Sequence, residues 1–214
     1  MRFRQLFLAA ALVAATVAPV ARAQVVFSDN FEANPLKLDA APAGWVLNTE
    51  GKVNLIGSSN LPGSEVGLPD PLPGNGVYVD LIGTSGVPAY LVSPTFALEV
   101  GVQYIATFAL AGNQSSGVEV VQVNFGDKEV IYEVPFAEGF TTRRITFTPS
   151  SAAAYSISFQ TNNPPGLAVG PGGSDRGALL DALAITAVPE PARYALLLAG
   201  LVALHVVARR RIQQ

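Results

Sequence analysis

The middle of this 214-residue chain lacks the spacing of apolar residues that a helix needs. Between residues 24 and 187, no run of ten or more residues repeats its apolar side chains at the helical period of about 3.6 residues. Short runs rich in Val, Ile, Phe, Tyr and Thr recur instead, separated by Gly, Pro, Asn and Ser. The 20 Gly and 16 Pro of the chain fit such a turn-rich protein. The sequence therefore predicts an all-β domain.

The apolar runs have the lengths typical of antiparallel strands. Apolar and polar residues alternate most clearly at residues 155–160, and residues 125–128 predict a tight hairpin turn in which Gly126 and Asp127 supply positive φ angles. Residues 57–76 predict the longest loop. Many short strands without intervening helices favour a two-sheet sandwich, with a closed barrel as the alternative. Strands are expected at residues 25–31, 45–47, 52–56, 77–82, 90–92, 103–110, 118–125, 129–134, 143–148, 155–160 and 179–186.

Residues 1–23 have the three parts of a secretory signal peptide. Arg2 and Arg4 precede an apolar stretch at residues 6–20, and Ala21-Arg22-Ala23 is a small-residue cleavage site. Gln24 is then the first residue of the mature protein, after the Sec export machinery and signal peptidase have acted. An uncleaved anchor helix is the alternative, but the apolar stretch is short for one.

Residues 188–214 combine an extended segment, an apolar segment and a basic cluster. Pro189 and Pro191 disfavour a helix in the residues before them. Residues 192–208 would form a helix about 26 Å long, close to the roughly 30 Å of a bilayer's hydrocarbon core. The three arginines at residues 209–211 predict that residues 212–214, which follow them, stay in the cytoplasm. The combined motif consists of Val188, Pro189, Glu190, Pro191, Arg209, Arg210 and Arg211.

This order of Pro-Glu-Pro, apolar helix and Arg cluster resembles the PEP-CTERM sorting signal of Gram-negative bacteria. The resemblance implies that an exosortase, a membrane-embedded cysteine protease-like enzyme, recognises the motif and removes the helix. The protein would then pass from an inner-membrane intermediate to the cell surface or extracellular matrix, often alongside exopolysaccharide. A single-pass tail anchor is the alternative, although such an anchor needs no Pro-Glu-Pro.

The exported part of the chain, residues 24–187, is strongly acidic. It contains six Lys and Arg against 15 Asp and Glu, which gives a net charge of −9. Nucleic acids are excluded as partners, because their phosphates require clustered Lys and Arg. Cations and neutral sugars are better suited, and a net charge of this size also serves solubility alone.

The residues most often used in catalysis are missing from the exported part. The chain has no Cys, and its one His, His205, lies in the C-terminal apolar segment. Cys-His and Ser-His-Asp arrangements and ordinary zinc sites are therefore excluded from the domain. Paired carboxylates could still hydrolyse a glycoside, but a domain this small leaves little wall for a substrate cleft. We expect a protein that is not an enzyme and has no catalytic residues.

Four short motifs follow one another along the exported part: Asp29-Asn30-Phe31-Glu32 followed by Gly44-Trp45, then residues 75–81, 109–113 and 180–183. They resemble galactose-binding-like domains of the DUF642-related "choice-of-anchor" kind, which implies a jelly-roll β-sandwich carried by exported bacterial proteins. In the last strand of those relatives Asn usually follows Asp, whereas this chain has Ala182.

Asp181 is a candidate for a buried carboxylate. It shares strand parity with Leu179, Leu183 and Ile185, so strict alternation points it inward. A buried carboxylate must be paired, neutralised or bound to a metal, and hard oxygen ligands suit Ca²⁺. The resemblance to jelly-roll domains implies a structural calcium near the first and last strands, with Asp29, Glu32 and Asp181 as ligands. A bulge that turns Asp181 to solvent, or bonds from backbone N–H groups, is the alternative.

The sequence thus predicts an exported, surface-sorted protein whose folded domain binds carbohydrate or matrix. A structural scaffold without a small ligand and a carbohydrate-active hydrolase are the alternatives. Trp45, the only tryptophan, belongs either to the core or to a surface that stacks on sugars, and Tyr78, Tyr90 and Tyr132 have the same two interpretations. No ligand-binding residue is predicted beyond these.

Overall fold

The chain divides into two units. The computed structural model describes residues 23–47, 50–84, 86–115, 117–161 and 177–188, together with Gly200. Residues 25–187 form one compact unit, the β domain, and the two ends of the chain form the other. The predicted signal peptide and sorting signal lie almost entirely outside the described residues. Within those residues, no helix is long and apolar enough to span a bilayer.

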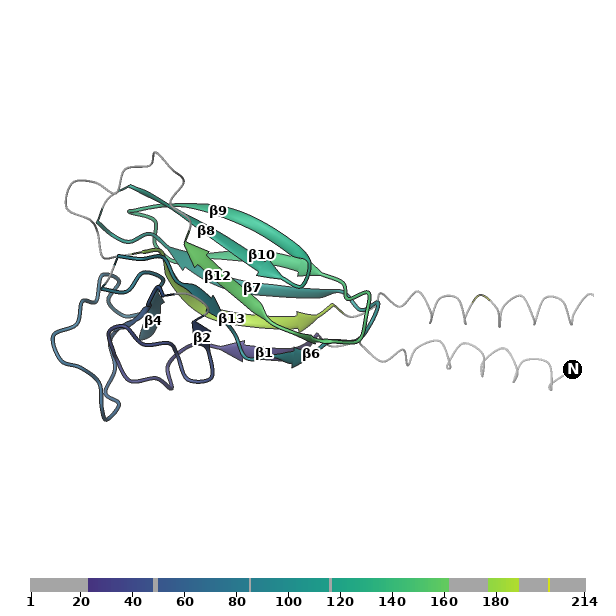
Figure 1. Cartoon of the computed structure of the whole chain (residues 1–214), viewed down its shortest axis with the longest axis horizontal. Helices are drawn as coiled ribbons and strands as arrows, with labels where there is room; N and C mark the ends of the chain where they lie inside the picture. Colours follow the sequence, from purple (N-terminus) through teal and green to yellow (C-terminus); the bar gives the residue numbers. More distant parts are fainter. Residues whose placement is uncertain are drawn as a thin grey trace, which may run out of the picture. The chain divides into compact units, whose positions relative to one another are not determined.

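The described part of the β domain is built from strands in three antiparallel sheets (Figure 1). One sheet has the order β10-β7-β13-β4-β3, with β1 also paired to β13, and another has the order β2-β5-β12-β8-β9. A small third sheet joins β6 and β11. The strands are β1 (Gln24–Asp29), β2 (Val46–Leu47), β3 (Asn54–Gly57), β4 (Val77–Asp80), β5 (Tyr90–Val92), β6 (Phe96–Ala97), β7 (Tyr104–Ala111), β8 (Val118–Phe125), β9 (Lys128–Pro135), β10 (Thr141–Phe147), β11 (Ala154–Tyr155), β12 (Ile157–Thr161) and β13 (Leu179–Ala187).

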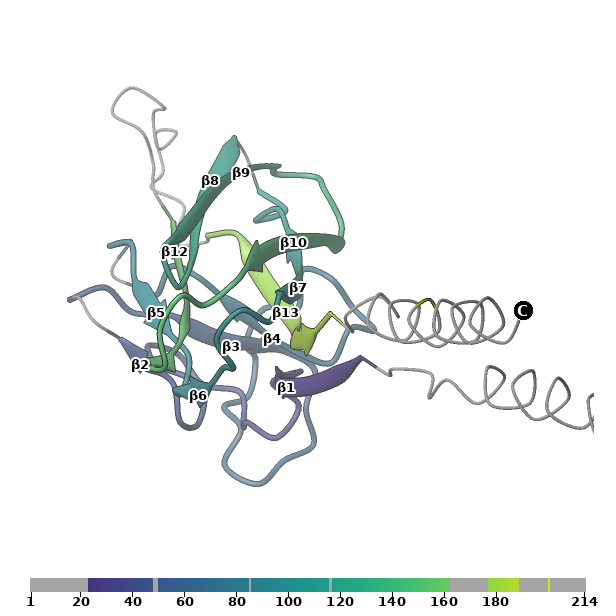
Figure 2. The same cartoon turned by 90° about the vertical axis from the view of Figure 1, so that its right-hand side faces the viewer.

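The six-stranded and five-stranded sheets pack face to face as separate layers (Figure 2). Their inner faces supply one core, in which Phe108 from β7 and Phe159 from β12 meet at 5.1 Å between ring centroids. Fully burying a side chain of this kind contributes about 1.5–3 kcal/mol relative to its exposure. The prediction of an all-β, two-sheet sandwich is therefore confirmed, and the barrel alternative is wrong.

The ends of the predicted strands agree with the observed ones to within two residues, apart from two strands, and one turn also differs from its prediction. The two-residue strand β6 was not predicted. The predicted strand at residues 155–160 is interrupted at Ser156, so that β11 pairs with β6 while β12 joins the five-stranded sheet. In the hairpin turn between β8 and β9, Gly126 has φ +61° but Asp127 does not have a positive φ. Glycine alone at the first central position is the pattern of a type II′ turn.

A β-bulge in β13 overturns the predicted inward orientation of Asp181. The pairing of β13 with β7 shifts between Asp181 and Ala184, and Ala182 adopts φ +51°. Leu183 therefore points into the core although it has the same parity as Asp181, which is only partly buried. An extra residue in one strand reverses the alternation beyond it. The alternative of a bulge at this position is confirmed.

The sandwich has two distinct ends. β1 begins and β13 ends at one of them, which we call the terminal end (Figure 1). At the other, the loop end, residues 112–117 connect β7 to β8 and residues 136–140 connect β9 to β10. Asp80 also lies at the loop end, because β4 pairs there with the first residues of β13.

Candidate functional site

The outer face of the five-stranded sheet carries a row of side chains that runs across four strands. In β8, Val121, Val123 and Phe125 point into the core, so the residues between them point outward. Antiparallel pairing places one outward residue from each strand in line. Neighbouring strands lie about 4.8 Å apart, so the row is about 14 Å long. The members of this row are Tyr90 (β5), Gln160 (β12), Gln122 (β8) and Ile131 (β9).

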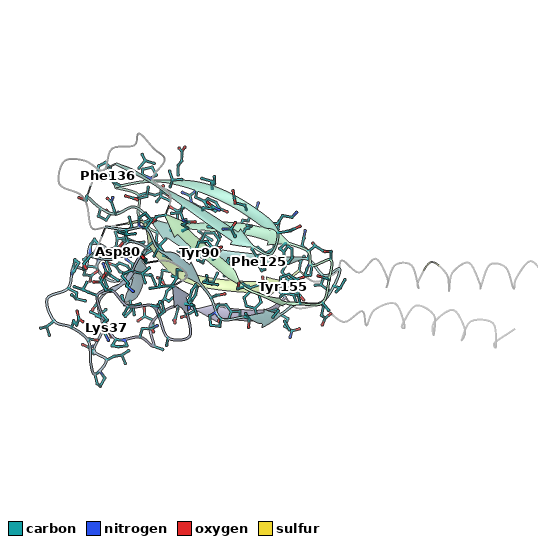
Figure 3. All side chains as sticks on the ribbon, viewed as in Figure 1. Lys37, Asp80, Tyr90, Phe125, Phe136 and Tyr155 are labelled. Atoms are coloured by element: carbon teal, nitrogen blue, oxygen red, sulfur yellow. The ribbon has the colours of Figure 1, made fainter. Side chains whose placement is uncertain are left out.

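Two side chains outside the row form hydrogen bonds with members of the row. Ser158 donates a hydrogen bond from Oγ to Oη of Tyr90, at 2.9 Å. Gln122 donates from Nε2 to Oε2 of Glu129, at 2.8 Å. These bonds reduce the rotamer freedom of Tyr90 and Gln122, which lowers the entropy that a ligand would have to remove on binding. In the view of Figure 3, Tyr90 lies between Asp80 at the loop end and Phe125.

Of the aromatic residues singled out in the sequence, Tyr90 alone belongs to this row. Trp45 is 5% exposed and contacts the rings of Phe31 and Phe159, so its interpretation as a core residue is confirmed. Tyr78 is fully buried, and burial raises the pKa of its hydroxyl. Tyr132 extends from β9 toward β10 and donates its hydroxyl to the carbonyl oxygen of Arg144, at 2.6 Å.

The amide residues of the row were missed in the sequence analysis. Gln122 and Gln160 lie 38 positions apart in the sequence, yet they are direct partners across β8 and β12. Their outward position is readable from the alternation of β8 and β12, but their alignment depends on register between distant strands. Nothing local in the sequence encodes that register.

The three carboxylates predicted to bind calcium lie in one region, next to the β1–β13 pairing. Asp29 ends β1, and its two carboxylate oxygens accept hydrogen bonds from the Phe31 amide at 2.8 Å and from Trp45 Nε1 at 2.7 Å. Glu32 Oε1 accepts from the Val77 amide at 3.1 Å. Asp181 Oδ1 accepts from the Ala182 amide at 2.6 Å. The alternative of backbone N–H bonds to Asp181 is thus present in the structure.

Electrostatics links these carboxylates. Partial burial raises the pKa of Asp181 to about 6, the Ala182 amide lowers it, and the negative charges of Glu32 and Asp29 raise it further. Among the described residues, Glu32 Oε2 and Asp181 Oδ2 accept no hydrogen bond. These two carboxylate oxygens are ligand atoms of the type that Ca²⁺ prefers. No set of three acidic, His or Cys side chains in the described ranges is arranged to hold a metal ion. The calcium site stays a prediction.

An open groove of about 510 Å³ lies between the edge strands β9 and β10. Glu129 is its only acidic lining residue among those described, so the two carboxylates of an ordinary glycosidase do not meet there. The groove is lined by Lys128, Glu129, Val130, Arg144, Ile145 and Thr146.

No family model and no curated protein matches the sequence. Among solved structures, the chain is similar to the CBM22-1 xylan-binding domain of Xyn10C from Paenibacillus barcinonensis, with 9% identity, 80% of this chain and 99% of that chain covered, and a TM-score of 0.49. The CBM22-2 xylan-binding domain of the same protein has 10% identity, coverage of 76% and 99%, and a TM-score of 0.44. The K3 cleaved adhesin domain of Lys-gingipain from Porphyromonas gingivalis has 13% identity, coverage of 76% and 98%, and a TM-score of 0.45.

Proposed function

We propose that the β domain is a jelly roll that acts as a non-catalytic carbohydrate- or matrix-binding module, and that the row Tyr90-Gln160-Gln122-Ile131 is its binding surface. The observation that carries this proposal is the alignment of an aromatic ring and two amides across neighbouring strands of one sheet face. The ring offers an apolar surface to a sugar, and each amide offers both donors and an acceptor to sugar hydroxyls. A few polar groups on an otherwise apolar surface are typical of ligand sites.

Charge favours a neutral glycan as the ligand. The row contains no charged residue, and Glu129 and Glu133 lie on the same face of β9. Together with the net charge of −9 on residues 24–187, these carboxylates would repel an anionic polysaccharide. A neutral polysaccharide meets no such repulsion.

The same proposal includes delivery to the cell surface. Signal peptidase would release the chain at Gln24, and an exosortase would cut near Pro191 after the inner-membrane intermediate has formed. The order of Pro-Glu-Pro, apolar segment and Arg cluster supports this route. Surface delivery would place the domain in contact with exopolysaccharide or another glycan of the matrix.

Affinity electrophoresis of the mature protein tests the binding proposal. Retardation is expected in gels containing neutral polysaccharides such as xyloglucan or dextran, and not in gels containing alginate. Tyr90→Ala and Gln122→Ala should each weaken binding about tenfold, which corresponds to about 1.4 kcal/mol. Gln103→Ala, an exposed glutamine outside the row, is the matched control and should bind as wild type.

The outcomes separate the candidate functions. Binding that survives both substitutions would place the ligand on another surface. No retardation by any polysaccharide would favour the structural scaffold, and release of reducing sugars during incubation would favour the hydrolase.

A further inference from the structure

The strand β9 is an open edge of the five-stranded sheet. It ends the order of that sheet and, with eight residues, is the longest edge strand in the described part of the chain. In Figure 1 it is the uppermost strand of the β domain. The edges at the opposite ends of the two sheet orders are protected, because β2 has only two residues and Leu55 of β3 exchanges backbone hydrogen bonds with Lys37. Sheet edges are usually shortened or covered in this way, so the long open edge of β9 is available to a partner strand.

Every second residue of β9 directs its backbone N–H and C=O groups away from β8. Residues of an antiparallel pair alternate between bonding to the partner strand and pointing away from it. Phe136, directly after β9, donates from its amide to the Gly117 carbonyl oxygen at 3.0 Å, so the even-numbered residues bond to β8. Pro135, which has no N–H, falls in the odd-numbered set, where a proline costs no ladder bond. The other odd-numbered residues have backbone groups without a hydrogen-bond partner among the described residues: Glu129, Ile131 and Glu133.

The neighbouring edge strand, β10, is less open. The carbonyl oxygen of Arg144 already accepts a hydrogen bond from the hydroxyl of Tyr132, at 2.6 Å. The groove of about 510 Å³ between the two strands lies beside the open edge of β9. A strand added to β9 would direct every second side chain toward this groove, where Val130 and Ile145 provide apolar contacts. Because Lys128 and Arg144 also line the groove, apolar side chains are favoured at those positions and basic ones are not.

The outward side chains of β9 select a basic partner. Glu129 and Glu133 flank Ile131 on the outer face, and Ile131 is 58% exposed. Residues directly opposite each other on neighbouring strands interact through their side chains, and opposite charges stabilise such a pair. The complementary strand therefore has Lys or Arg opposite each glutamate and an apolar residue opposite Ile131. A second copy of β9 is a poor partner, because pairing centred on Ile131 would place Glu129 opposite Glu133.

We propose that the free edge of β9 binds an extended basic segment of another protein, which joins the five-stranded sheet as an additional strand. The segment presents a basic, an apolar and a basic side chain beside Glu133, Ile131 and Glu129, and its intervening apolar side chains enter the groove. Backbone hydrogen bonds provide the affinity, and the two glutamates provide the selectivity for charge. The proposal does not depend on the proposed glycan binding, because it uses neither Tyr90 nor the amides of the row.

Isothermal titration calorimetry of the mature protein with an acetylated and amidated peptide, Thr-Lys-Val-Ile-Val-Lys-Thr, tests this proposal. Each lysine can lie opposite a glutamate, the isoleucine opposite Ile131 and the valines over the groove. We expect this peptide to bind, and a peptide with glutamate in place of both lysines not to bind. N-methylation of the isoleucine, whose N–H would face β9, should abolish binding, whereas N-methylation of a valine, whose N–H faces away, should preserve it.

Two substitutions at one residue separate the backbone from the charge. Glu133→Thr removes the charge and keeps the N–H, so it should weaken binding by up to about fivefold, as expected for one exposed ion pair. Glu133→Pro removes both and should weaken binding by a further factor of about two to twelve, as expected for one hydrogen bond. Neither variant removes a bond to β8, so both should melt within a few degrees of wild type. Glu99→Thr changes an exposed glutamate away from β9 and is the matched control, which should bind as wild type.

Several outcomes would overturn the proposal. Failure of the lysine peptide to bind, or equal binding of the lysine and glutamate peptides, would remove the basic partner. Equal binding of the two N-methylated peptides, or of Glu133→Pro and Glu133→Thr, would show association that does not use the strand edge. If Glu133→Pro does not fold, the N-methylated peptides still decide, because they are tested on wild-type protein. Dimers of the mature protein in analytical ultracentrifugation that are lost in Glu133→Pro would assign the edge to a second copy.

Discussion

The hairpin turn between β8 and β9 makes a steric prediction that a single methyl group can test. Gly126 has φ +61°, and a Cβ at this position would overlap the ring of Phe147 from β10 in the opposite sheet. Phe147 is 5% exposed and packs on Phe125 and Tyr155, with ring centroids 5.2 and 5.1 Å away. The ring therefore has little room to move away, and Gly126→Ala should be strongly destabilising.

The magnitude follows from two costs and one gain. The left-handed conformation costs alanine about 1–2 kcal/mol, and overpacking against a fixed ring costs about 1–3 kcal/mol. Alanine also restricts the unfolded chain more than glycine does, and this lower entropy of the unfolded state stabilises the fold by about 0.4–1 kcal/mol. The net loss is about 1–4.6 kcal/mol, which for a domain of this size lowers the melting temperature by about 2–18 °C.

Gly101→Ala is the matched control for this prediction. Gly101 has φ +81°, but a Cβ there would meet nothing within 4 Å. The Gly101→Ala variant therefore has only the cost of placing alanine in the left-handed conformation. Calorimetry of both variants should show its melting temperature lowered by a few degrees. Adding Gly126→Ala to a Phe147→Leu background should cost less than adding it to wild type, because the smaller side chain relieves the overlap. Equal shifts for Gly126→Ala and Gly101→Ala would refute the steric argument.

Three further predictions concern the calcium site and the chain ends. If calcium binds at Asp181, EDTA should lower the melting temperature of wild type by about 5–11 °C, since an ion at a hundredfold excess over its Kd stabilises by about 2.7 kcal/mol. Asp181→Ala should then melt at the same temperature with and without EDTA. If EDTA leaves the melting temperature of the wild-type protein unchanged, calcium does not bind at Asp181. Intact-mass analysis of surface material should give a chain that begins at Gln24 and ends close to Pro191; full-length chain retained in the inner membrane of a host with an exosortase contradicts the sorting proposal. Replacing Pro189 and Pro191 with alanine should block this release without lowering the melting temperature, because both lie outside the β domain.

The strands were predictable where local chemistry determines them. The predicted strand at residues 118–125 has the same ends as β8. Its end was predictable because Gly126 and Asp127, which follow it, are residues typical of a two-residue hairpin turn. The bulge in β13 was not predicted as the main interpretation, because Ala182 gives no sign of adopting a left-handed conformation. The resulting reversal of alternation explains why Asp181 was expected in the core.

The candidate site was predictable only in part. Tyr90 was recognised as an aromatic residue that could contact a sugar, whereas Gln122 and Gln160 were not singled out. Amides at outward positions are ordinary in any solvated sheet, and only the pairing of β5, β12 and β8 brings these residues into line with Tyr90. The proximity of Asp29 and Asp181 was expected from a family resemblance, and the pairing of β1 with β13 accounts for it.

The position of β1 and β13 at the terminal end has a mechanical consequence. The two strands are neighbours, and one begins where the other ends (Figure 1). A force that pulled residues 25 and 187 apart would act across the strands, so that their hydrogen bonds would break one after another rather than together. Such an arrangement opens at a lower force than one loaded along its strands. The β domain is therefore suited to hang from a single attachment and unsuited to serve as a link in a stretched chain of domains.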